Sequence, residues 1–549
     1  MLYSVFERIA TPTYFTALLS LVFLSFYNRP MWLEVQRLTS IDGNSDWIFL
    51  ITLFLCIFFA MNAVLTLLSW SFLLKPISII LILITASANY FISVFGVMID
   101  REMIRNVFET DVAEFSDLIT LRLIIHLIVG AAIPIWLILR IRIRFQTVPQ
   151  EIKRQGVVFL TSLVLIAVII FLQFPHYSVF FRNNRHVRHM VTPINAIYAT
   201  SSYLKRTHFK TTKKPIRKVG QDAIFIKNQS INDGKRIVFI MIVGETARAA
   251  NYSIQGYSRP TSPNLEQGGG IYFSNVSSCG TATAISLPCM FSPEGREKYS
   301  PSRYSEGLLD VLAQAGAQVV WRNNNSGCKG TCNRIKYENM TKHETSEYCG
   351  EDGCIDEVLL DGIEEILDQG TEPLVLVLHL KGSHGPAYYK RYPDTFRRFT
   401  PTCDKADITG CERQSIINTY DNTLLYTDHV IGRVLTLLKA RQERNHAALL
   451  YVSDHGESLG ENNIYLHGLP YSIAPKEQTH VPLYLWLSKS FSAIQGLDSA
   501  CIDRLKEKPH SHDHLFHSVL GLMNVQTTAR QTELDFTATC RKRDKSNPQ

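Results

Sequence analysis

In the stretch Arg236-Ile237-Val238-Phe239-Ile240-Met241-Ile242-Val243, the arginine is followed by a continuous run of apolar, mostly β-branched residues. A run without polar alternation is typical of a strand buried on both faces of a parallel sheet. Similar runs recur at residues 317–321, 374–380 and 447–452, with helical stretches between them at about 305–315, 355–369 and 414–441. Strands that alternate with helices predict a doubly wound, mostly parallel α/β sheet in this part of the chain.

The part of the chain that precedes this stretch has a different composition, because it contains long apolar segments. Five of them are long enough to cross a bilayer as helices, which takes roughly 20 residues each. They cover residues 11–28, 47–70, 76–98, 119–139 and 157–174. The first apolar segment lacks a small-residue cleavage site and is followed by further apolar segments, so we do not expect it to be a cleavable signal peptide. We therefore predict an α-helical membrane domain of five transmembrane helices ahead of the α/β domain.

The loops between these segments predict the orientation of the chain. The fourth-to-fifth loop is basic and contains Arg140, Arg142, Arg144, Lys153 and Arg154. Basic loops stay in the cytoplasm, whereas the third-to-fourth loop is acidic and is expected outside. The fifth helix then exits the cytoplasm, which puts the α/β domain in the periplasm and the helices in the bacterial inner membrane.

The cysteines support an oxidising compartment for the α/β domain. Of the 11 cysteines, Cys56 lies in an apolar run and the other ten all follow residue 278. Their short spacings suggest disulfides between sequence neighbours. The suggested pairs are Cys279–Cys289, Cys328–Cys332, Cys349–Cys354, Cys403–Cys411 and Cys501–Cys540. Other connectivities stay open at this point, as does zinc binding by Cys328 and Cys332 in a reducing compartment.

Three regions follow from these patterns: a transmembrane domain over 1–175, a connector over 176–232 and a periplasmic α/β domain over 233–549. The connector is basic with interleaved aromatic residues, which suits an amphipathic segment lying on anionic lipid, although an ordinary charged linker is the alternative. The net charge is only +7, so no nucleic-acid partner is indicated.

Polar residues follow three of the predicted strands where each strand ends. The motifs are Gly244-Glu245-Thr246, Lys381-Gly382-Ser383-His384-Gly385-Pro386, Ser453-Asp454-His455-Gly456-Glu457 and, slightly later, His467-Gly468. Ligands of doubly wound folds gather beyond the carboxyl ends of the strands, so these side chains are expected to converge on a metal. Glutamate, aspartate and histidine suit zinc, whose fourth position stays open for the reacting group.

A candidate for that reacting group lies in the loop Ser277-Ser278-Cys279-Gly280-Thr281-Ala282-Thr283-Ala284-Ile285-Ser286-Leu287-Pro288-Cys289. Small residues leave room in front of a hydroxyl, and a Cys279–Cys289 bridge would keep the loop rigid. Thr283 or Thr281 is the candidate nucleophile, because a metal lowers the pKa of a bound hydroxyl. A stapled surface loop without a catalytic role is the alternative.

A second polar pattern lies in the acidic loop between the third and fourth apolar segments. Asn106, Thr110 and Glu114 recur every four residues, so they share one face of a helix. Such a face at the outer membrane surface could meet a lipid headgroup. A solvated loop helix is the alternative interpretation.

These motifs resemble those of the lipid A phosphoethanolamine transferases, which include the mobile colistin resistance enzymes and belong to the alkaline phosphatase/sulfatase superfamily. The resemblance covers essentially the whole chain. It rests on Gly244-Glu245-Thr246-Ala247-Arg248, Cys279-Gly280-Thr281-Ala282-Thr283, Ser383-His384-Gly385-Pro386 and Ser453-Asp454-His455-Gly456-Glu457-Ser458-Leu459-Gly460-Glu461.

The resemblance implies roles for individual residues. Glu245, Asp454 and His455 match the family's zinc ligands, and Thr283 matches its nucleophile, which also contacts the zinc. The residues that match its substrate-binding positions are His384, His467, Asn325, Ser326, Lys329, Asn106, Thr110 and Glu114. Of these, His384 and His467 match histidines that hold phosphoryl oxygens, or a second zinc when one is bound.

The resemblance also implies the reaction. Thr283 would take phosphoethanolamine from phosphatidylethanolamine, release diacylglycerol and pass the group to a phosphate of lipid A, giving resistance to polymyxin and other cationic peptides. The expected protein is a monomer among membrane lipids. The alternatives are transfer to core sugars and a glycerophosphate transferase of the lipoteichoic acid synthase type. A sulfatase is disfavoured because neither cysteine beside Thr283 lies in a C/S-x-P-x-R context, and a membrane sensor would need no nucleophile.

Overall fold

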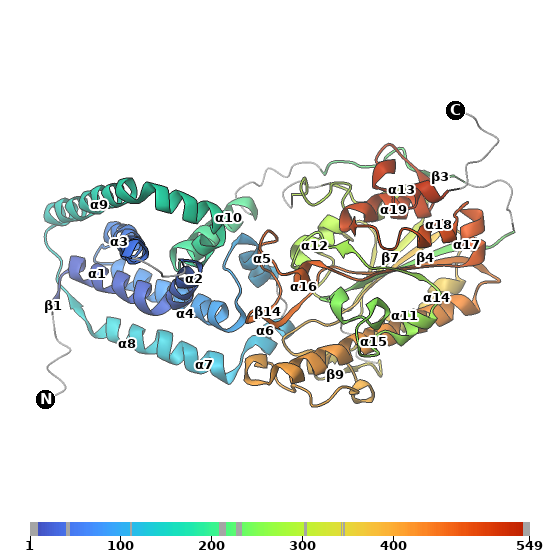
Figure 1. The fold of residues 1–549 in the computed structure, drawn as a ribbon, viewed down its shortest axis with the longest axis horizontal. Helices are drawn as coiled ribbons and strands as arrows, with labels where there is room; N and C mark the ends of the chain where they lie inside the picture. The colour runs from blue at the N-terminus through green and yellow to red at the C-terminus, as the bar shows by residue number, and fades with distance from the viewer. Residues whose placement is uncertain are drawn as a thin grey trace. The chain divides into compact units, whose positions relative to one another are not determined.

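The computed structural model describes residues 9–39, 44–109, 112–207, 216–226, 233–300, 305–341, 343 and 346–541 (Figure 1). Its contacts divide the chain into two compact units. The helical unit contains Met1–Ile104 and Ile119–Phe209, and the α/β unit contains Arg105–Leu118 and Lys210–Gln549. The α/β unit therefore includes a short segment from the N-terminal part of the chain.

The helical unit is built from long apolar helices that are joined by short turns. Its elements are α1 (Pro12–Val22), which continues through a π-helical turn (Phe23–Tyr27), α2 (Arg29–Thr39), α3 (Asn44–Leu67), α4 (Leu74–Phe95), the first turn of α5 (Arg101–Glu109), α7 (Leu121–Leu127), a second π-helical turn (Ile128–Ala132), α8 (Ile133–Arg140), α9 (Val148–Asn183) and α10 (Ile194–Thr207). The predicted connector begins inside α9 and includes α10, and its residues 208–215 and 227–232 lie outside the described residues.

Four helical stretches within the described residues are long and apolar enough to cross a membrane. They are Trp47–Leu67, Leu74–Phe95, Leu121–Arg140 and Val148–Asn183, with mean hydropathies of 2.7, 2.1, 2.2 and 2.8. The first of the five predicted spans forms a shorter apolar helix, Pro12–Tyr27. Asn28 follows its last turn, where the amide donates to Phe23 O at 2.9 Å and to Thr192 O at 2.7 Å. Length and hydropathy thus support four spans, and the count of five stays a prediction.

The outer surfaces of these helices are apolar. On α9, Val157, Leu160, Val164, Phe171 and Leu172 are each between 57% and 81% exposed. Apolar side chains in water are unfavourable in such numbers, so a continuous apolar surface indicates contact with lipid or with another apolar partner. Because all backbone hydrogen bonds of a helix are internal, such helices suit a bilayer.

The α/β unit is organised around a seven-stranded sheet with the order β5-β15-β12-β4-β11-β7-β8. The strands are β5 (Ile271–Phe273), β15 (Leu483–Leu487), β12 (Asn445–Ser453), β4 (Arg236–Gly244), β11 (Leu374–His379), β7 (Gln318–Asn323) and β8 (Lys336–Asn339). The five strands from β12 to β8 are parallel, and β15 and β5 are antiparallel to their neighbours. The sheet is therefore mixed but mostly parallel. Residues 236–243 lie in its central strand, β4.

Helices cover both faces of this sheet (Figure 1). One face packs on α12 (Thr283–Met290), α13 (Leu308–Gln314) and α19 (Leu515–Leu522), in a core that contains Phe239, Met241 and Val243. The long helix α15 (Arg413–Ala440) lies on the opposite side of the sheet together with α11 (Pro263–Gln267). Both faces of β4 are covered, which explains why its sequence shows no polar alternation.

Five disulfides link neighbouring cysteines of the α/β unit, in the pairs that sequence spacing suggests. They are Cys279–Cys289, Cys328–Cys332, Cys349–Cys354, Cys403–Cys411 and Cys501–Cys540. Cys56, in α3, is free. The cysteine pair 328–332 is therefore a disulfide in this structure and not a pair of thiolate ligands.

Candidate active site

The candidate site begins where two neighbouring parallel strands end side by side. Gly244 at the end of β4 pairs in register with Ser453 at the end of β12. Asp454 N donates to Gly244 O at 3.0 Å, which continues the ladder by one more residue. The next residues, Glu245 and Asp454, therefore leave the sheet at the same edge.

Glu245, Asp454 and His455 form a cluster with metal-ligand chemistry. Each side chain is fully buried, and one ligand atom from each lies within 4.8 Å of the others. His455 Nε2 lies 3.4 Å from Glu245 Oε1 and 3.5 Å from Asp454 Oδ2. His455 Nδ1 is hydrogen-bonded to Gly456 O at 2.9 Å, which turns Nε2 toward the carboxylates. The arrangement directs two carboxylates and one imidazole at a common point.

The electrostatics of this cluster favour a cation. Burial, and after it the charge of Glu245, raises the pKa of Asp454 above its usual range. Burial opposes a positive charge on His455, but Asp454 and Glu245 outweigh it and raise the pKa of this histidine. Among the described residues Asp454 Oδ2 has no hydrogen-bond partner. A buried carboxylate oxygen without a donor is costly, so these residues fit a bound metal ion.

Thr283 points its hydroxyl into the cluster, whereas Thr281 does not. Thr283 is the first residue of α12, and its Oγ1 lies 3.1 and 3.0 Å from Glu245 Oε1 and Oε2 and 3.3 Å from His455 Nε2. Thr281 Oγ1 donates to Leu469 O at 2.6 Å and is buried. Thr283 is only partly buried, so a substrate can reach its hydroxyl.

Hydrogen bonds to His512 and Asp454 hold the loop and helix that carry Thr283 in place. Cys279 N donates to His512 Nδ1 at 3.1 Å, and Ser286 Oγ on α12 donates to Asp454 O at 2.5 Å. Burial lowers the pKa of His512 to about 3, so this histidine is a neutral hydrogen-bond acceptor in the physiological range. These contacts join the start of the loop, the helix and a candidate metal ligand in one rigid assembly.

His384 and His467 lie beside the cluster. The ring centroids of His455 and His467 are 4.4 Å apart, and those of His384 and His467 are 6.0 Å apart. Glu457 Oε2 lies 2.7 Å from His467 Nδ1 and orients this histidine. Glu457 Oε1 accepts a hydrogen bond from the Tyr388 hydroxyl. The two histidines thus add nitrogen atoms beside the candidate metal position.

The β11 loop reaches the cluster by a close backbone approach. Ser383 N donates to Glu245 O at 3.0 Å. Gly382 has a φ of +52°, and a Cβ built there would lie 2.8 Å from Glu245 O. Only glycine fits this position without strain, because it tolerates a positive φ and has no side chain to clash.

Asn325 orients one of the candidate ligands. Its Nδ2 donates to Glu245 Oε2 at 2.8 Å and to Leu380 O at 2.8 Å, and its Oδ1 accepts from Ser326 N at 2.6 Å. The residues Asn325, Ser326 and Lys329 follow β7, so the structure brings this predicted motif to the same sheet edge. The ammonium group of Lys329 donates a hydrogen bond to Glu109 O at 3.3 Å.

The predicted lipid-facing residues are described only in part. Asn106 lies on α5 and is partly buried. Thr110 lies outside the described residues, and Glu114 belongs to helix α6 (Val112–Leu118), in which its side chain is not described. Both α5 from Arg105 onward and α6 belong to the α/β unit.

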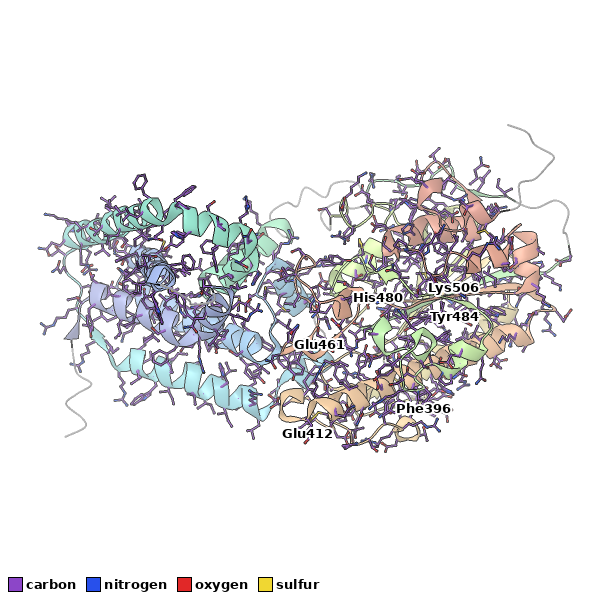
Figure 2. The ribbon with its side chains drawn as sticks, in the orientation of Figure 1. Phe396, Glu412, Glu461, His480, Tyr484 and Lys506 are labelled. Atoms are coloured by element: carbon purple, nitrogen blue, oxygen red, sulfur yellow. A yellow bond between two sulfur atoms is a disulfide. The ribbon has the colours of Figure 1, made fainter. Side chains whose placement is uncertain are left out.

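Several side chains that support the site were not identified from the sequence. Glu457 lies in the Asp454-His455 motif, and that position was the available signal for its contact with His467. Arg248, in the Glu245 motif, donates to Glu457 O at 3.3 Å and to Glu461 at 2.8 Å (Glu461 is labelled in Figure 2). Tyr388 is distant in sequence and carries no motif that would have revealed its contact.

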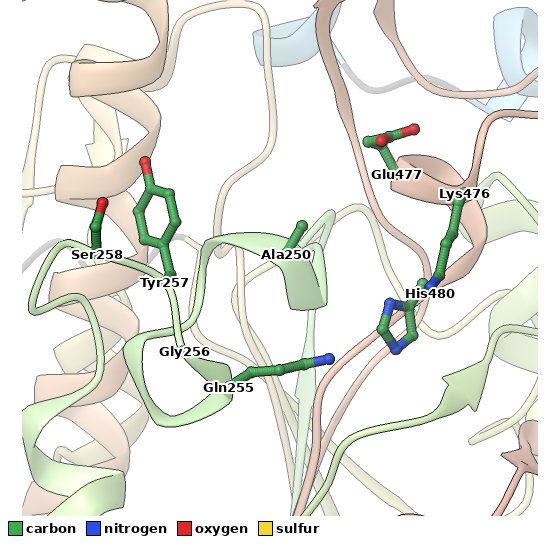
Figure 3. Close-up of a pocket in the computed structure, with 8 residues that line it drawn as sticks. All are labelled: Ala250, Gln255, Gly256, Tyr257, Ser258, Lys476, Glu477 and His480. Carbon is green, nitrogen blue, oxygen red and sulfur yellow. The ribbon is translucent and has the colours of Figure 1, made fainter.

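A separate cavity of about 490 Å³ lies in the α/β unit (Figure 3). Its lining residues come from the segment before α11 and from around α16 (Lys476–Thr479): Ala250, Gln255, Gly256, Tyr257, Ser258, Lys476, Glu477 and His480. None of the candidate metal ligands lines this cavity, so it is distinct from the cluster.

Comparisons with known proteins all indicate the same family. A family model described as "Sulfatase" matches residues 237–525, and one described as "Phosphoethanolamine transferase EptA/EptB" matches residues 57–208. The chain is 39% identical over 524 residues to the phosphoethanolamine transferase EptA of Escherichia coli K12, covering 94% of each protein. It is 33% identical over 533 residues to the phosphatidylethanolamine transferase Mcr-1 of Escherichia coli, covering 95% of this chain and 96% of that one.

A solved structure matches nearly the whole chain. The integral membrane protein lipooligosaccharide phosphoethanolamine transferase A of Neisseria meningitidis superposes with a TM-score of 0.91 at 36% identity, covering 96% of this chain and 98% of the other. Apolar helices, an α/β domain of the sulfatase type and relatives of full length thus lead to the same assignment. The chain belongs to the phosphoethanolamine transferase EptA/EptB family, within the alkaline phosphatase/sulfatase superfamily, and is a phosphoethanolamine transferase.

Proposed function

We propose that the protein transfers phosphoethanolamine from phosphatidylethanolamine to a phosphate group of lipid A, through a covalent phosphoethanolamine-threonine at Thr283. The observation that carries this proposal is the position of Thr283 Oγ1, 3.0–3.3 Å from Glu245 and His455 in a buried cluster. The names of relatives support the substrates, since they include phosphatidylethanolamine and lipooligosaccharide. A further relative from Escherichia coli K12, 28% identical over 479 residues and covering 81% of each chain, is named Kdo(2)-lipid A phosphoethanolamine 7''-transferase.

Zinc is the metal that this cluster suits best. Glu245, Asp454 and His455 would hold it, with the Thr283 oxygen in the fourth position, because carboxylate oxygens and imidazole nitrogens both bind zinc and a catalytic zinc with three protein ligands keeps its fourth position open. Zinc, when bound there, lowers the pKa of the threonine hydroxyl and neutralises charge on the phosphoryl oxygens. The Asp454 oxygen without a donor supports this assignment.

The first half-reaction forms one bond and breaks one. The Thr283 oxygen attacks the phosphorus of the donor, and the bond between phosphorus and the glycerol oxygen breaks. Diacylglycerol leaves as an alcohol, which takes up the proton that the threonine hydroxyl gives away. The position of Thr283 at the first turn of α12 supports the step, because amides at a helix start favour a negatively charged phosphoryl group.

In the second half-reaction an oxygen of a lipid A phosphate attacks the same phosphorus, and the Thr283 oxygen leaves. His384, His467 and Lys329 would bind the phosphoryl oxygens in both steps. Asn325 would keep Glu245 in place, and Ser326 would contact the ethanolamine phosphate. Asn106, Thr110 and Glu114 would contact the lipid substrate. The added amine reduces the attraction of lipid A for cationic peptides, which gives resistance to polymyxin.

The proposal includes a location. We place the helical unit in the bacterial inner membrane as five spans, with Pro12–Tyr27 as the shortest, and the α/β unit in the periplasm as a monomer. The five disulfides of the α/β unit support an oxidising compartment. The proposed domains keep the boundaries 1–175, 176–232 and 233–549.

Mass spectrometry of lipid A tests the proposal. Cells that express the protein should gain lipid A species heavier by one phosphoethanolamine, and cells that express Thr283→Ala at an equal level should not. Transfer to core sugars would appear as unchanged lipid A with a heavier core, and a glycerophosphate transferase would add a different mass. Either result contradicts the proposed acceptor or donor.

A further inference from the structure

The segment Arg105–Leu118 belongs to the α/β unit although it lies between the apolar helices α4 and α7 in the sequence. It contains the predicted lipid-facing residues. Two of its described contacts, at Glu109 and at Asp117, join it to loops of the α/β unit. These contacts decide how firmly the segment is held.

The contact at the C-terminal end is a buried ion-pair cluster around Asp117. This carboxylate is 8% exposed, and it pairs with Lys390 Nζ at 2.9 Å and with Arg391 at 2.8 Å. Arg391 is 5% exposed. Lys390 also pairs with Asp352 at 3.0 Å. A buried carboxylate between two cations is held firmly, and removing one partner leaves uncompensated buried charge.

The arginine of this cluster also holds the loop of a predicted substrate ligand. Arg391 Nε donates to His384 O at 2.8 Å, so one guanidinium group binds both Asp117 and the backbone of His384. Three residues before Arg391, Tyr388 donates to Glu457, which in turn holds His467. The same short loop therefore contacts the membrane-side segment and supports both histidines.

The other described contact reaches the segment at Glu109, which lies between the predicted lipid-facing residues Asn106 and Thr110 in the sequence. Lys329 Nζ donates to Glu109 O at the end of α5. In the sequence, these two anchoring contacts, at Glu109 and Asp117, flank the predicted lipid-facing residues Thr110 and Glu114. One anchor carries Lys329 and the other leads to His384, and both are residues to which we assign phosphoryl contacts.

We propose that Asp117 is a positioning residue that holds the segment 105–118 against the His384 loop and thereby sets the affinity for the lipid donor. The inference rests on the proposed function, because it assumes that the segment meets the donor lipid. Binding requires the segment to be ordered, and the cluster supplies that order before the lipid arrives. Asp117 is not required for the chemical step, because it contacts neither Thr283 nor the metal ligands through any described hydrogen bond or ion pair.

The test compares full-length variants in vesicles of phosphatidylethanolamine and phosphatidylcholine with lipid A added. Diacylglycerol release is measured against the mole fraction of phosphatidylethanolamine. For Asp117→Asn we expect KM for the donor to rise about tenfold, the scale of one lost charge-assisted hydrogen bond, while kcat stays within about twofold. Asp117→Glu, which keeps the charge, should restore much of the affinity.

Asp310→Asn is the matched control. Asp310 is a buried carboxylate of the same unit that pairs with Arg334 at 2.7 Å, outside the segment and the site. It should lower stability and leave KM unchanged. Equal KM values for the wild type and Asp117→Asn would overturn the inference, and so would an equal rise in Asp310→Asn, since general destabilisation would then explain the effect.

Hydrogen–deuterium exchange supplies a second readout that does not depend on turnover. Peptides from residues 105–118 should exchange faster in Asp117→Asn than in the wild type, and Asp310→Asn should leave them unchanged. Unchanged exchange in Asp117→Asn would contradict the anchoring. If the wild type releases no diacylglycerol, the proposed function is wrong, and the exchange measurement still decides whether Asp117 holds the segment.

Discussion

Thr281 and Thr283 are two positions apart in the chain, yet they have different chemistry available to them. The Thr281 hydroxyl is used in a hydrogen bond to Leu469 O, whereas the Thr283 hydroxyl faces two carboxylate oxygens and an imidazole nitrogen. The turn into α12 separates the two side chains. At the residue scale, local backbone direction therefore decides which hydroxyl can react.

Exchanging each threonine tests this difference. Thr283→Ala should abolish phosphoethanolamine transfer, with a loss of at least about a thousandfold for a missing nucleophile, and should leave zinc content and folding intact. Thr281→Val should lower stability by about 1 kcal/mol, the scale of one lost hydrogen bond, and keep activity. Transfer assays and thermal unfolding of both variants provide the comparison. Full activity in Thr283→Ala would refute the covalent mechanism.

Asn325 is expected to tune metal affinity without binding the metal. Its amide donates to Glu245 Oε2, so Asn325→Ala frees that carboxylate to rotate. Loss of a residue that orients a ligand typically weakens metal binding by about 10–100-fold. Competition with a zinc chelator should show this loss. Asn323→Ala, a neighbour that contacts Asn325 O and His379 instead, is the control, and equal zinc affinity in Asn325→Ala would contradict the assigned role.

At the scale of single elements, α12 is the part that positions the proposed nucleophile, Thr283. It begins at Thr283, its Ser286 is bonded to Asp454 O, and its Cys289 is joined to Cys279 ahead of the loop. Each constraint acts at a different point along one short helix. The helix therefore presents its first hydroxyl to the candidate metal ligands with little freedom.

Removing the disulfide across this helix tests that idea. The double variant Cys279→Ala/Cys289→Ala should lose stability by about 2–3 kcal/mol and also lose much of kcat. The control, Cys403→Ala/Cys411→Ala, removes a bridge of sequence separation 8 instead of 10, remote from the nucleophile loop in sequence. It should lose comparable stability and retain kcat. Equal kcat values for the two double variants would show that the first bridge has no special role in positioning Thr283.

At the scale of the whole molecule, the chain consists of two compact units with different sources of stability. All five disulfides and the candidate metal cluster lie in the α/β unit. The helical unit has apolar outer surfaces and relies on a lipid or detergent environment. The two units should therefore respond to different agents.

Calorimetry of the purified protein in detergent tests this separation. We expect two unfolding transitions. Zinc should raise the midpoint temperature of only one transition, because a ligand stabilises the unit that binds it. The expected stabilisation is about 2.7 kcal/mol at a zinc concentration of 100 times Kd. A reductant should lower that same transition. Magnesium at an equal concentration is the control, and a zinc effect on both transitions, or on neither, would contradict the assignment of the metal site to the α/β unit.

Much of the fold followed from local patterns. The apolar runs at 236–243, 374–380 and 447–452 became β4, β11 and β12, because a strand covered on both faces must be apolar throughout. The strand β8, with the sequence Lys336-Tyr337-Glu338-Asn339, could not be found this way. An edge strand takes its hydrogen bonds from one neighbour and needs no apolar face. The first apolar segment, predicted as a span over 11–28, forms the helix Pro12–Tyr27, and Asn28 follows it with contacts to Phe23 and Thr192.

The class of the protein and the residue types of its candidate metal site could be predicted from the sequence, because carboxylates and histidines that follow neighbouring parallel strands meet at one sheet edge. The sequence also indicated the cysteine pairs, since neighbours in short loops meet easily. Only the tertiary structure decided which distant residues support the site. Tyr388 and Arg391 reach Glu457 and Asp117 through folding, and no local pattern records such contacts. Hydrogen bonds between remote loops depend on how the elements pack, and packing is a property of the whole chain.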